Sequence, residues 1–455
     1  MAETNTSQEI IEAIKASPST KIKLGVTDID GILRGKIISK EKFLKAIDKN
    51  IGFCDVVFGW DANDAVYNNS KITGWHTGFP DATASIDLST SRKIPWNDDT
   101  PLFLADFHRD ENISNVCPRT LLKRVTEEAL NLGFKPKFAN EFEWFNFRET
   151  PDSLNEKGGI NPTPLTPGMF GYSILRSSQN QAYFDDLFNL LGKFGVPLEG
   201  LHTETGNGVY EAAIAYTDIL EAADRAVLFK TGVKEIASRH EIMASFMAKW
   251  NVNLPGCSGH IHQSLWDEKE EKNLFFDDAR DHSISTIMEQ YIAGQLHCLP
   301  HILPMYAPTV NSYKRMVAGS WAATSVSWGI ENRTTALRVI NQSVDAMRLE
   351  NRVPGADTNP YLSMAASLAS GLYGIKHKLS LDIEATFGNE YDHKDHQKLP
   401  ATLAEATEKM NHSDLAAKLF GKTFTDHFTR TREWEWEQFS NAVTNWEIKR
   451  YFEII

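Results

Sequence analysis

The segment KFANEFEWFNF alternates acidic and aromatic residues, and this alternation constrains the fold more than any other feature of the chain. Glu141 and Glu143 are two residues apart, so they share one face of a β-strand. The aromatic residues Phe142 and Trp144 then occupy the other face. Two carboxylates on one enclosed face repel each other, and one stays protonated unless a cation lies between them. The segment therefore predicts either a strand with a cation-binding face or, as the alternative, a solvated edge strand.

Three further segments place polar side chains on one face of a strand or around a tight turn. In GCSGHIHQSL and DAMRLENRVPG the polar residues alternate along a strand, whereas PLEGLHTETGNGVYEAA carries acids on both sides of a Thr-Gly-Asn-Gly turn. Core histidines, a solvated ion-pair strand and a plain acidic loop are the respective alternatives to a binding site. The residues concerned are His260, His262 and Ser264, then Arg348, Glu350 and Arg352, and finally Glu199, Glu204 and Glu211.

Combined, these segments indicate the chemistry of phosphoryl transfer. Five carboxylates and a histidine offer hard oxygen and imidazole ligands, which suit Mg²⁺ or Mn²⁺ better than Zn²⁺. Nearby arginines suit phosphate and carboxylate groups through forked hydrogen bonds. These arginines are Arg315, Arg333, Arg338, Arg348 and Arg352. Metal ligands together with arginines are typical of phosphoryl transfer, and the lack of GxxxxGK(S/T), HRD and DFG motifs excludes a P-loop protein and a protein kinase.

Composition narrows the class of protein. The 455-residue chain carries 47 basic and 60 acidic side chains, with a formal net charge of -13. Without a basic block, such a chain is not expected to bind nucleic acid or an anionic membrane. No run approaches the roughly 20 apolar residues of a membrane span, and the polar N-terminus is unlike a signal peptide. The four cysteines form no CxxC pair, which favours reduced thiols in a cytoplasmic enzyme or scaffold.

The order of local patterns indicates a small β-rich domain followed by a larger one. Within roughly the first 110 residues, KIKLGVTDIDGILRGKIIS predicts a hairpin that turns at Asp-Gly. CPRTLLKRVTEEALNLGF then predicts a helix that begins near Pro118 and ends at Gly133, and we place a domain boundary just before it. Further helices are predicted at FDDLFNLLGKFGVP and from Thr217 to about His240.

Near its end the chain carries an aromatic pattern in REWEWEQFSNAVTNWEIKRYF. Trp436, Phe439, Val443 and Trp446 fall at helical spacing there. The pattern predicts the packing stripe of a C-terminal helix, and a cofactor-binding box is the alternative.

The order of these segments resembles the glutamine synthetase family over nearly the whole chain. Five motifs occur in the family's order and with near-family spacing: NEFEWF, HTETGNGVYE, GCSGHIHQSL, NSYKRMVAG followed by ENRTTALR, and RLENRVPGADTNPY. The resemblance implies an α+β fold with an N-terminal β-grasp domain over residues 1–112 and a catalytic domain over residues 113–455. The catalytic domain would surround its site with an open, curved antiparallel sheet flanked by helices. The resemblance also implies a homo-oligomer of two stacked rings, a dodecamer or decamer, in which a neighbour's N-terminal domain completes each site.

The resemblance assigns a role to individual positions of this sequence. One metal site would contain Glu143, Glu204 and Glu211, and a second would contain Glu141, His260 and Glu350. The positions around ATP are Glu199, Tyr216, His262, Ser264, Arg338 and Arg348, with Tyr216 as an aromatic wall. The phosphate-facing arginines are Arg333 and Arg338, and the glutamate-binding positions are Gly256, Arg315 and Arg352.

The implied reaction uses ATP and two or three Mg²⁺ or Mn²⁺ ions, with L-glutamate and an amine as substrates. The γ-carboxylate of glutamate attacks the γ-phosphate of ATP and gives a γ-glutamyl phosphate. The amine then displaces phosphate and forms an amide. Metal ions neutralise and orient the phosphate oxygens, and the arginines hold the transferred group. The amine must arrive unprotonated, so a nearby base is required.

Trp321 is the clearest departure from the family's pattern. Ammonia-using members carry, on the flexible loop after the Lys-Arg pair, a glutamate that closes the site and takes a proton from ammonium. Counting from KRMVAG, that position is Trp321 here, and indole cannot accept a proton. A shifted acid is the alternative, but the next carboxylate along the loop is Glu331, ten residues away. Pro255 precedes Gly256 where ammonia-using enzymes often carry Asn.

These departures favour an organic amine over ammonia as the second substrate. An indole face packs an alkyl chain or attracts a cationic head through a cation–π contact of about 0.5–2 kcal/mol. The leading hypothesis is therefore a γ-glutamylpolyamine or γ-glutamylalkylamide synthetase in which Trp321 sets the choice of amine. A true glutamine synthetase is the first alternative, and a non-catalytic structural or signalling relative is the second. For the base, FCDVVFGWDANDAVY offers Asp55, Asp61 and Asp64, and the sequence leaves this choice open.

Overall fold

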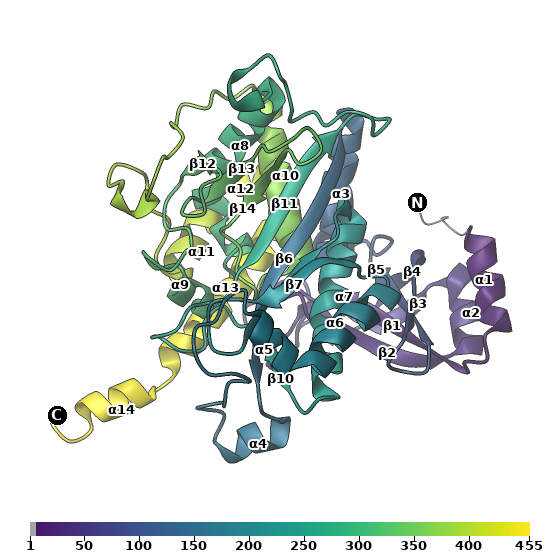
Figure 1. Ribbon diagram of the computed structural model, residues 1–455. Coiled ribbons are helices and arrows are strands. Elements are labelled where there is room, and N and C mark those ends of the chain that lie inside the picture. Colours follow the sequence, from purple (N-terminus) through teal and green to yellow (C-terminus); the bar gives the residue numbers. More distant parts are fainter. Residues whose placement is uncertain (1–5) are drawn as a thin grey trace.

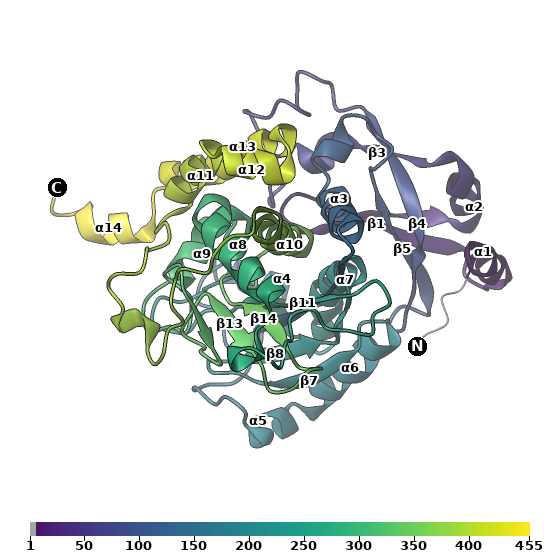
Figure 2. The same cartoon turned by 90° about the horizontal axis from the view of Figure 1, so that it is seen from above.

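The computed structural model describes residues 6–455, which form two β-sheets with helices packed against both (Figure 1). The N-terminal sheet has five strands in the order β2-β1-β5-β4-β3. Helices α1 (Ser7–Ala16) and α2 (Lys40–Lys49) pack on its outer side (Figure 2). The strands of this sheet are β1 (Lys21–Thr27), β2 (Leu33–Ser39), β3 (Ile51–Cys54), β4 (Asp81–Ile94) and β5 (Thr100–Asp106).

The first two strands form the hairpin that the sequence predicts, since β1 pairs with β2 in antiparallel register. The carboxylate of Asp28 accepts hydrogen bonds from the backbone amides of Asp30 and Ile32, at 3.0 and 2.8 Å. Gly31 adopts a φ of 82°, a conformation that glycine reaches without a steric penalty. The segment from Asp28 to Gly31 therefore turns the chain for a local reason, because the side chain of Asp28 and the glycine both favour a tight reversal.

The large sheet has nine strands, seven of which follow the order β12-β13-β14-β11-β6-β8-β7, while β9 and β10 pair with β6. Neighbouring strands are antiparallel except β12 and β13, which are parallel. The expected antiparallel sheet is therefore observed with one parallel pair at its edge. The strands are β6 (Lys135–Phe147), β7 (Leu198–Thr203), β8 (Val209–Ile214), β9 (Thr217–Asp218), β10 (Met243–Ser245), β11 (Gly259–Trp266), β12 (Trp328–Ile330), β13 (Leu337–Ile340) and β14 (Arg348–Asn351).

Helices α3 and α7 lie between the two sheets and cover one face of the large one (Figure 2). Phe142 of β6 stacks on Phe229 of α7, with ring centroids 5.8 Å apart. Because side chains alternate along a strand, Glu141 and Glu143 point to the opposite face. The helices are α3 (Pro118–Asn131), α4 (Pro151–Glu156), α5 (Ile174–Gln179), α6 (Gln181–Lys193), α7 (Ile219–Ser238), α8 (Thr286–Ile302), α9 (Val310–Arg315), α10 (Pro360–His377), α11 (Leu403–Asn411), α12 (Asp414–Phe420), α13 (Lys422–Asn441) and α14 (Asn445–Tyr451).

The helices predicted from the first two-thirds of the chain are confirmed. Helix α3 begins at Pro118, as its sequence pattern indicates, and α6 contains the FDDLFNLLGK segment. Helix α7 begins at Ile219 rather than at Thr217, because Thr217 and Asp218 pair with β6 as strand β9. Thr217 and Asp218, which the local pattern assigns to the helix, are therefore part of the sheet.

The predicted packing stripe at the C-terminus is wrong beyond Trp436. Trp436 packs against the core, but Val443 and Trp446 are 74% and 60% exposed. The cause is a break in the helix: α13 ends, and the side chain of Thr444 caps a separate helix, α14. Helix α14 then extends away from the rest of the described chain (Figure 1), so its apolar side chains do not reach the core.

Two expectations from composition can be compared with the structure. The four cysteines are free thiols, which agrees with the absence of a CxxC pair. Among residues 6–455, none of the helices combines the length and the apolar character that crossing a membrane needs.

Arg119 of α3 joins the two sheets through a buried ion network. Its guanidinium lies 2.7 Å from Asp106 of β5 and 2.9 Å from Asp87 of β4. On the other side it lies 2.8 Å from Asp224 of α7, which also accepts a hydrogen bond of 2.6 Å from Tyr361 of α10. Elements from both halves of the chain therefore converge on one cation. The domain boundary after residue 112 falls between β5 and α3 and stays a prediction.

We expect Arg119→Met to lower the free energy of unfolding by about 3–5 kcal/mol, because the substitution leaves buried carboxylates without their cation. Urea unfolding followed by circular dichroism measures the change. Lys376→Met is the matched control, since Lys376 pairs with Glu128 on the surface and such pairs contribute about 0–1 kcal/mol. Equal losses for both variants would show that the Arg119 network does not hold the sheets together.

Candidate active site

Strand register assembles the acidic and basic side chains of the large sheet into one row. Residues that are directly opposed on neighbouring strands share a face, so each pair lies side by side. The row lies on the face opposite to helices α3 and α7. The opposed pairs are Glu143 with Glu211, Glu141 with His260, His262 with Glu350, and Glu350 with Arg338.

The centre of the row has the geometry of a cation site. Ligand atoms of Glu141, His262 and Glu350 all lie within 4.8 Å of one another. His260 joins them, with its Nδ1 at 3.3 Å from Glu141 and 3.4 Å from Glu350. The Nε2 atoms of His260 and His262 are buried without a hydrogen-bond partner. Buried polar atoms normally find a partner, so these nitrogens fit a role as ligands of a divalent cation.

A second group of ligands lies toward the β7 edge of the sheet. His202, Glu204 and Glu211 bring ligand atoms within 4.8 Å of one another. Glu143, which the sequence assigns to this set, lies opposite Glu211 and accepts a hydrogen bond of 2.8 Å from the backbone amide of Ser258. The structure therefore adds His202 to this group and leaves Glu143 beside it.

The two ends of the row differ in their electrostatics. Burial, together with the charges of Glu141 and Glu143, raises the pKa of Glu211 to about 11. Burial also acts on Glu350, but Arg352 at 2.5 Å and other nearby cations hold its pKa at about 2. The carboxylates at the β8 end thus lack a counter-charge that those at the β14 end have. A divalent cation at the β8 end would supply that charge.

The arginines that the sequence singles out occupy different environments. Arg338 pairs with Glu331 and, at 3.0 Å, with Glu350. Arg352 donates to Glu350 and to the carbonyl of Arg333, which is itself exposed. Arg348 donates a hydrogen bond of 3.1 Å to Nδ1 of His262. These contacts bring Arg338, Arg348 and Arg352 against the central cation site.

Arg315 and Gly256 lie together, as their shared assignment to glutamate binding requires. A Cβ at Gly256 would lie 2.7 Å from Cγ of Arg315 and 2.5 Å from the carbonyl oxygen of Ala248, so only glycine fits. The guanidinium of Arg315 is buried and donates to the carbonyls of Arg352, Val353 and Pro354, while its Nε has no partner. Arg315 thus also fixes the segment that follows β14.

The residues assigned to ATP divide into a buried and an exposed group. Ser264 is buried on β11, next to the central cation site, and accepts a hydrogen bond from Trp266. Glu199 on β7 and Tyr216 after β8 are exposed, with Tyr216 at 58%. Both lie toward the β7 edge of the sheet, whereas Arg348 lies on β14.

Trp321 stands on an exposed loop that starts at Arg315. Its side chain is 65% exposed, and its φ of 60° is uncommon for a residue with a side chain. Tyr391 anchors the loop by donating a hydrogen bond of 3.0 Å to the carbonyl of Ala322. Glu331, the alternative acid, accepts hydrogen bonds from Arg338 and Gln342 instead.

Two further residues near the β7 edge, Tyr172 and His202, were not singled out from the sequence. The ring of Tyr172 stacks on His202, with centroids 4.4 Å apart and an interplanar angle of 28°. Burial and the charges of Glu211 and Glu204 raise the pKa of Tyr172. His202 was detectable, since it precedes Glu204 by two residues, whereas Tyr172 comes from a Pro/Gly-rich loop without a pattern.

The three candidate bases lie in the N-terminal half and have different partners. Asp55 is buried, its Oδ1 has no hydrogen-bond partner, and burial raises its pKa. Asp61 accepts a hydrogen bond of 3.0 Å from Trp434, and Asp64 pairs with Arg34 at 2.7 Å. Their surroundings leave the choice among them open.

Comparisons with known proteins point in the same direction as this geometry. The family described as "Glutamine synthetase, catalytic domain" matches residues 115–451. A Dictyostelium discoideum protein named type-1 glutamine synthetase 2 is 51% identical, over 99% of this chain and 87% of its own. A glutamate–isopropylamine ligase from Pseudomonas sp. is 37% identical over 100% of both chains. A γ-glutamylethanolamide synthetase from Streptomyces coelicolor is 33% identical over 98% of this chain and 95% of its own.

The fold agrees with solved structures as well. A structure titled GmaS/ADP complex matches with a TM-score of 0.84 at 24% identity, over 97% of this chain and 99% of that chain. At this identity the likeness shows the shared fold. The family match covers residues 115–451, and the relatives cover 98% or more of the chain. This protein therefore belongs to the glutamine synthetase family, whose members are ATP-dependent carbon–nitrogen ligases that work with divalent metal ions.

Proposed function

We propose that this protein joins L-glutamate to an organic amine, such as an alkylamine or a polyamine, and so forms a γ-glutamyl amide. The observation that carries the proposal is Trp321, whose 65% exposed indole stands at the loop position where ammonia-using enzymes carry a glutamate. Glu331 does not replace that acid, because Arg338 already holds its carboxylate. An exposed indole favours an amine with an apolar or extended cationic body over ammonium.

The relatives support both this proposal and its alternative. Two of them are named for isopropylamine and ethanolamide chemistry and align over nearly their whole length. The Dictyostelium relative has higher identity and is named a glutamine synthetase. A true glutamine synthetase is therefore the second candidate function, and the choice of amine decides between them.

In the proposed reaction, the two ligand groups would hold two or three Mg²⁺ or Mn²⁺ ions, which neutralise the phosphate oxygens of ATP. The central group comprises Glu141, His260 and Glu350 with His262, and the second comprises Glu143, Glu204 and Glu211 with His202. Arg333 and Arg338 would hold the γ-phosphate while the γ-carboxylate of glutamate attacks it. Gly256, Arg315 and Arg352 would position glutamate for this attack.

The amine would then displace phosphate from γ-glutamyl phosphate. Trp321 and Tyr172 supply two aromatic faces that can pack its carbon chain or attract its cationic head. Because the amine must lose a proton before it attacks, we propose that Asp55, Asp61 or Asp64 assists from the N-terminal domain of a neighbouring copy.

We propose that the protein assembles as a homo-oligomer of two stacked rings and works in the cytoplasm. Contiguous exposed apolar side chains commonly mark sites of protein association. Such side chains occur on and after α14 and on the segment that contains Tyr172. They are Trp446, Ile448, Phe452, Ile454 and Ile455 in the first region and Met169, Phe170, Tyr172, Ile174 and Leu175 in the second.

The amine can be identified by a coupled phosphate-release assay with ATP, Mg²⁺ and L-glutamate. Ammonium, methylamine, ethanolamine, putrescine, spermidine and an aromatic amine form the panel. We expect kcat/KM for at least one organic amine to exceed that for ammonium by about tenfold or more, equivalent to about 1.4 kcal/mol. Efficient turnover with ammonium alone would establish the glutamine synthetase alternative. Turnover with none would favour a non-catalytic role, and Glu143→Ala serves as the inactive control.

Trp321→Glu tests whether the loop sets the choice of amine. We expect the ratio of kcat/KM for ammonium to that for the best organic amine to rise by about tenfold, because a carboxylate replaces the apolar face. Trp321→Phe is the matched control, since it keeps an aromatic face and should shift the ratio less. An unchanged ratio in Trp321→Glu would mean that Trp321 does not select the amine.

Glu211→Gln tests the acidic end of the row as a metal site. The substitution keeps the shape of the side chain and replaces a carboxyl whose pKa of about 11 keeps it protonated in the absence of a cation. We therefore expect the Tm in EDTA not to fall, while the affinity for Mn²⁺ measured by isothermal titration calorimetry falls by about tenfold or more. Glu156→Gln, an exposed acid on α4, is the control and should leave both values unchanged. Unchanged Mn²⁺ affinity in Glu211→Gln would contradict the assignment.

A further inference from the structure

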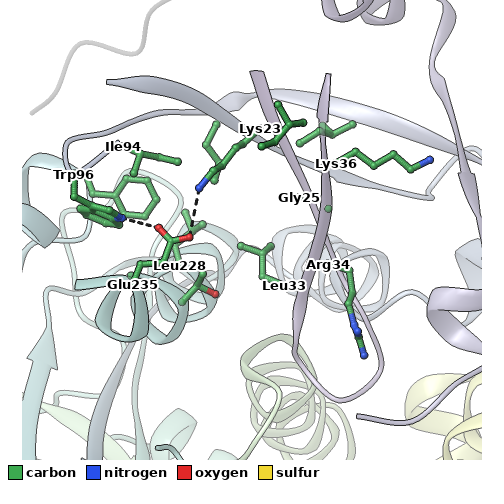
Figure 3. A pocket seen from close by; sticks show the side chains of 16 residues that line it. Lys23, Gly25, Leu33, Arg34, Lys36, Ile94, Trp96, Leu228 and Glu235 are labelled. Carbon is green, nitrogen blue, oxygen red and sulfur yellow. Dashed lines mark hydrogen bonds and ion pairs between the residues drawn. The ribbon is translucent and has the colours of Figure 1, made fainter. Parts of the chain in front are cut away.

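A cavity of about 190 Å³ lies between the N-terminal sheet and the helix layer of the large sheet (Figure 3). Strands β1, β2, β4 and β5 form one wall, and α7 with the end of α6 forms the other. Leu33, Ile94, Leu102, Phe194 and Leu228 make most of the lining apolar. The cavity lies on the helix side of the large sheet, whereas the candidate active site occupies the opposite face.

Polar side chains gather at one end of this cavity. Glu235 of α7 accepts a hydrogen bond of 2.6 Å from the indole of Trp96, and Nζ of Lys23 lies 3.4 Å from the same carboxylate. Figure 3 shows these three side chains pointing toward one another. The Lys23–Glu235 pair is long and partly exposed, so it contributes about 0–1 kcal/mol and can open at little cost.

The other cations of the lining are engaged elsewhere. Arg34 pairs with Asp28 at 2.8 Å and with Asp64 at 2.7 Å. Lys36 lies over the ring of Phe53, with its Nζ 4.5 Å from the centroid. Both side chains extend away from the cavity in Figure 3. The cavity is therefore faced by one positive charge, on Lys23, and one negative charge, on Glu235.

We propose that this cavity binds a small α-amino acid with an apolar side chain. The carboxylate of the ligand would pair with Lys23, and its α-ammonium group would pair with Glu235, so a zwitterion would satisfy both charges. Its side chain would fill the apolar part. A cavity of about 150 Å³ accommodates benzene, so the observed volume suits a branched aliphatic or phenyl group. Nucleotides and other large ligands need pockets of about 300 Å³ or more.

Occupancy of the cavity would act on the helix that supports the acidic strand. Lys23 belongs to β1 and Glu235 to α7, so a ligand that contacts both would tie the N-terminal sheet to this helix. On the same helix, Phe229 follows Leu228 of the lining and stacks on Phe142, between the acids of β6. Its position would therefore allow the cavity to act as a regulatory site, separate from the proposed amine, glutamate and ATP sites.

Isothermal titration calorimetry with L-leucine and L-phenylalanine tests the proposal. ADP, Mg²⁺ and L-glutamate are present at saturation, so that the candidate active site is filled. We expect one ligand to bind per chain. 4-Methylpentanoate, which has the same apolar body as leucine but no ammonium group, should bind at least about tenfold more weakly. Equal affinities for leucine and 4-methylpentanoate would show that the cavity does not recognise the ammonium group, which would contradict the proposal. No binding of either amino acid up to about 10 mM would also contradict it.

Two single substitutions separate this cavity from the glutamate site. Lys23→Gln and Glu235→Gln should each weaken leucine binding by about tenfold or more, because each removes one half of the charge complement. Lys36→Gln is the matched control, since Lys36 lines the cavity but points away from it. Phosphate release with the best amine should persist in all three variants. Unchanged leucine affinity in both Lys23→Gln and Glu235→Gln would show that the ligand binds elsewhere.

Discussion

The antiparallel register of β6 with its two neighbours, β8 and β11, determines the chemistry of this protein. It places Glu143 opposite Glu211 and Glu141 opposite His260, so that acids and imidazoles share one enclosed face. Burying like charges together is unfavourable unless cations balance them. Two arginines balance Glu350 at one end of the row, whereas burial together with neighbouring acids raises the pKa of Glu211 to about 11 at the other end. The fold therefore gathers carboxylates whose charges are balanced by arginines only at one end of the row.

The opposite face of the sheet makes this register rigid. Aromatic residues of β6 pack against α7, and the buried guanidinium of Arg119 connects α7 to the N-terminal sheet through Asp224 and Asp106. Helix α7 thus packs against the acidic strand, supplies Asp224 to the ion network of Arg119 and lines the cavity next to Glu235. A ligand or partner that moves the N-terminal sheet would also move helix α7, and through it strand β6 with its acidic side chains.

Sequence patterns predicted most residues of the candidate site because these residues come from strands with a simple period. Glu141 and His260 were found by alternation, and the register then showed that they are neighbours. The same patterns missed Tyr172 and Tyr391, neither of which belongs to a strand or an α-helix. Tyr391 contacts the loop of Trp321 across about seventy residues of sequence, and no local periodicity reports such a contact.

The sequence by itself determined the first hairpin, helices α3, α6 and α7, the acidic face of β6 and the resemblance to the family, because these follow from local periodicity and from motifs in order. Only the tertiary structure decided which acids meet which cations. It added His202 to the candidate ligands and paired Glu331 with Arg338, and it formed a cavity between the N-terminal sheet and helix α7. It also corrected the C-terminal helix, whose apolar pattern near Trp446 is real but finds no core within the described chain. Ion pairing and burial depend on distances between residues that are far apart in the sequence, and only the folded chain sets those distances.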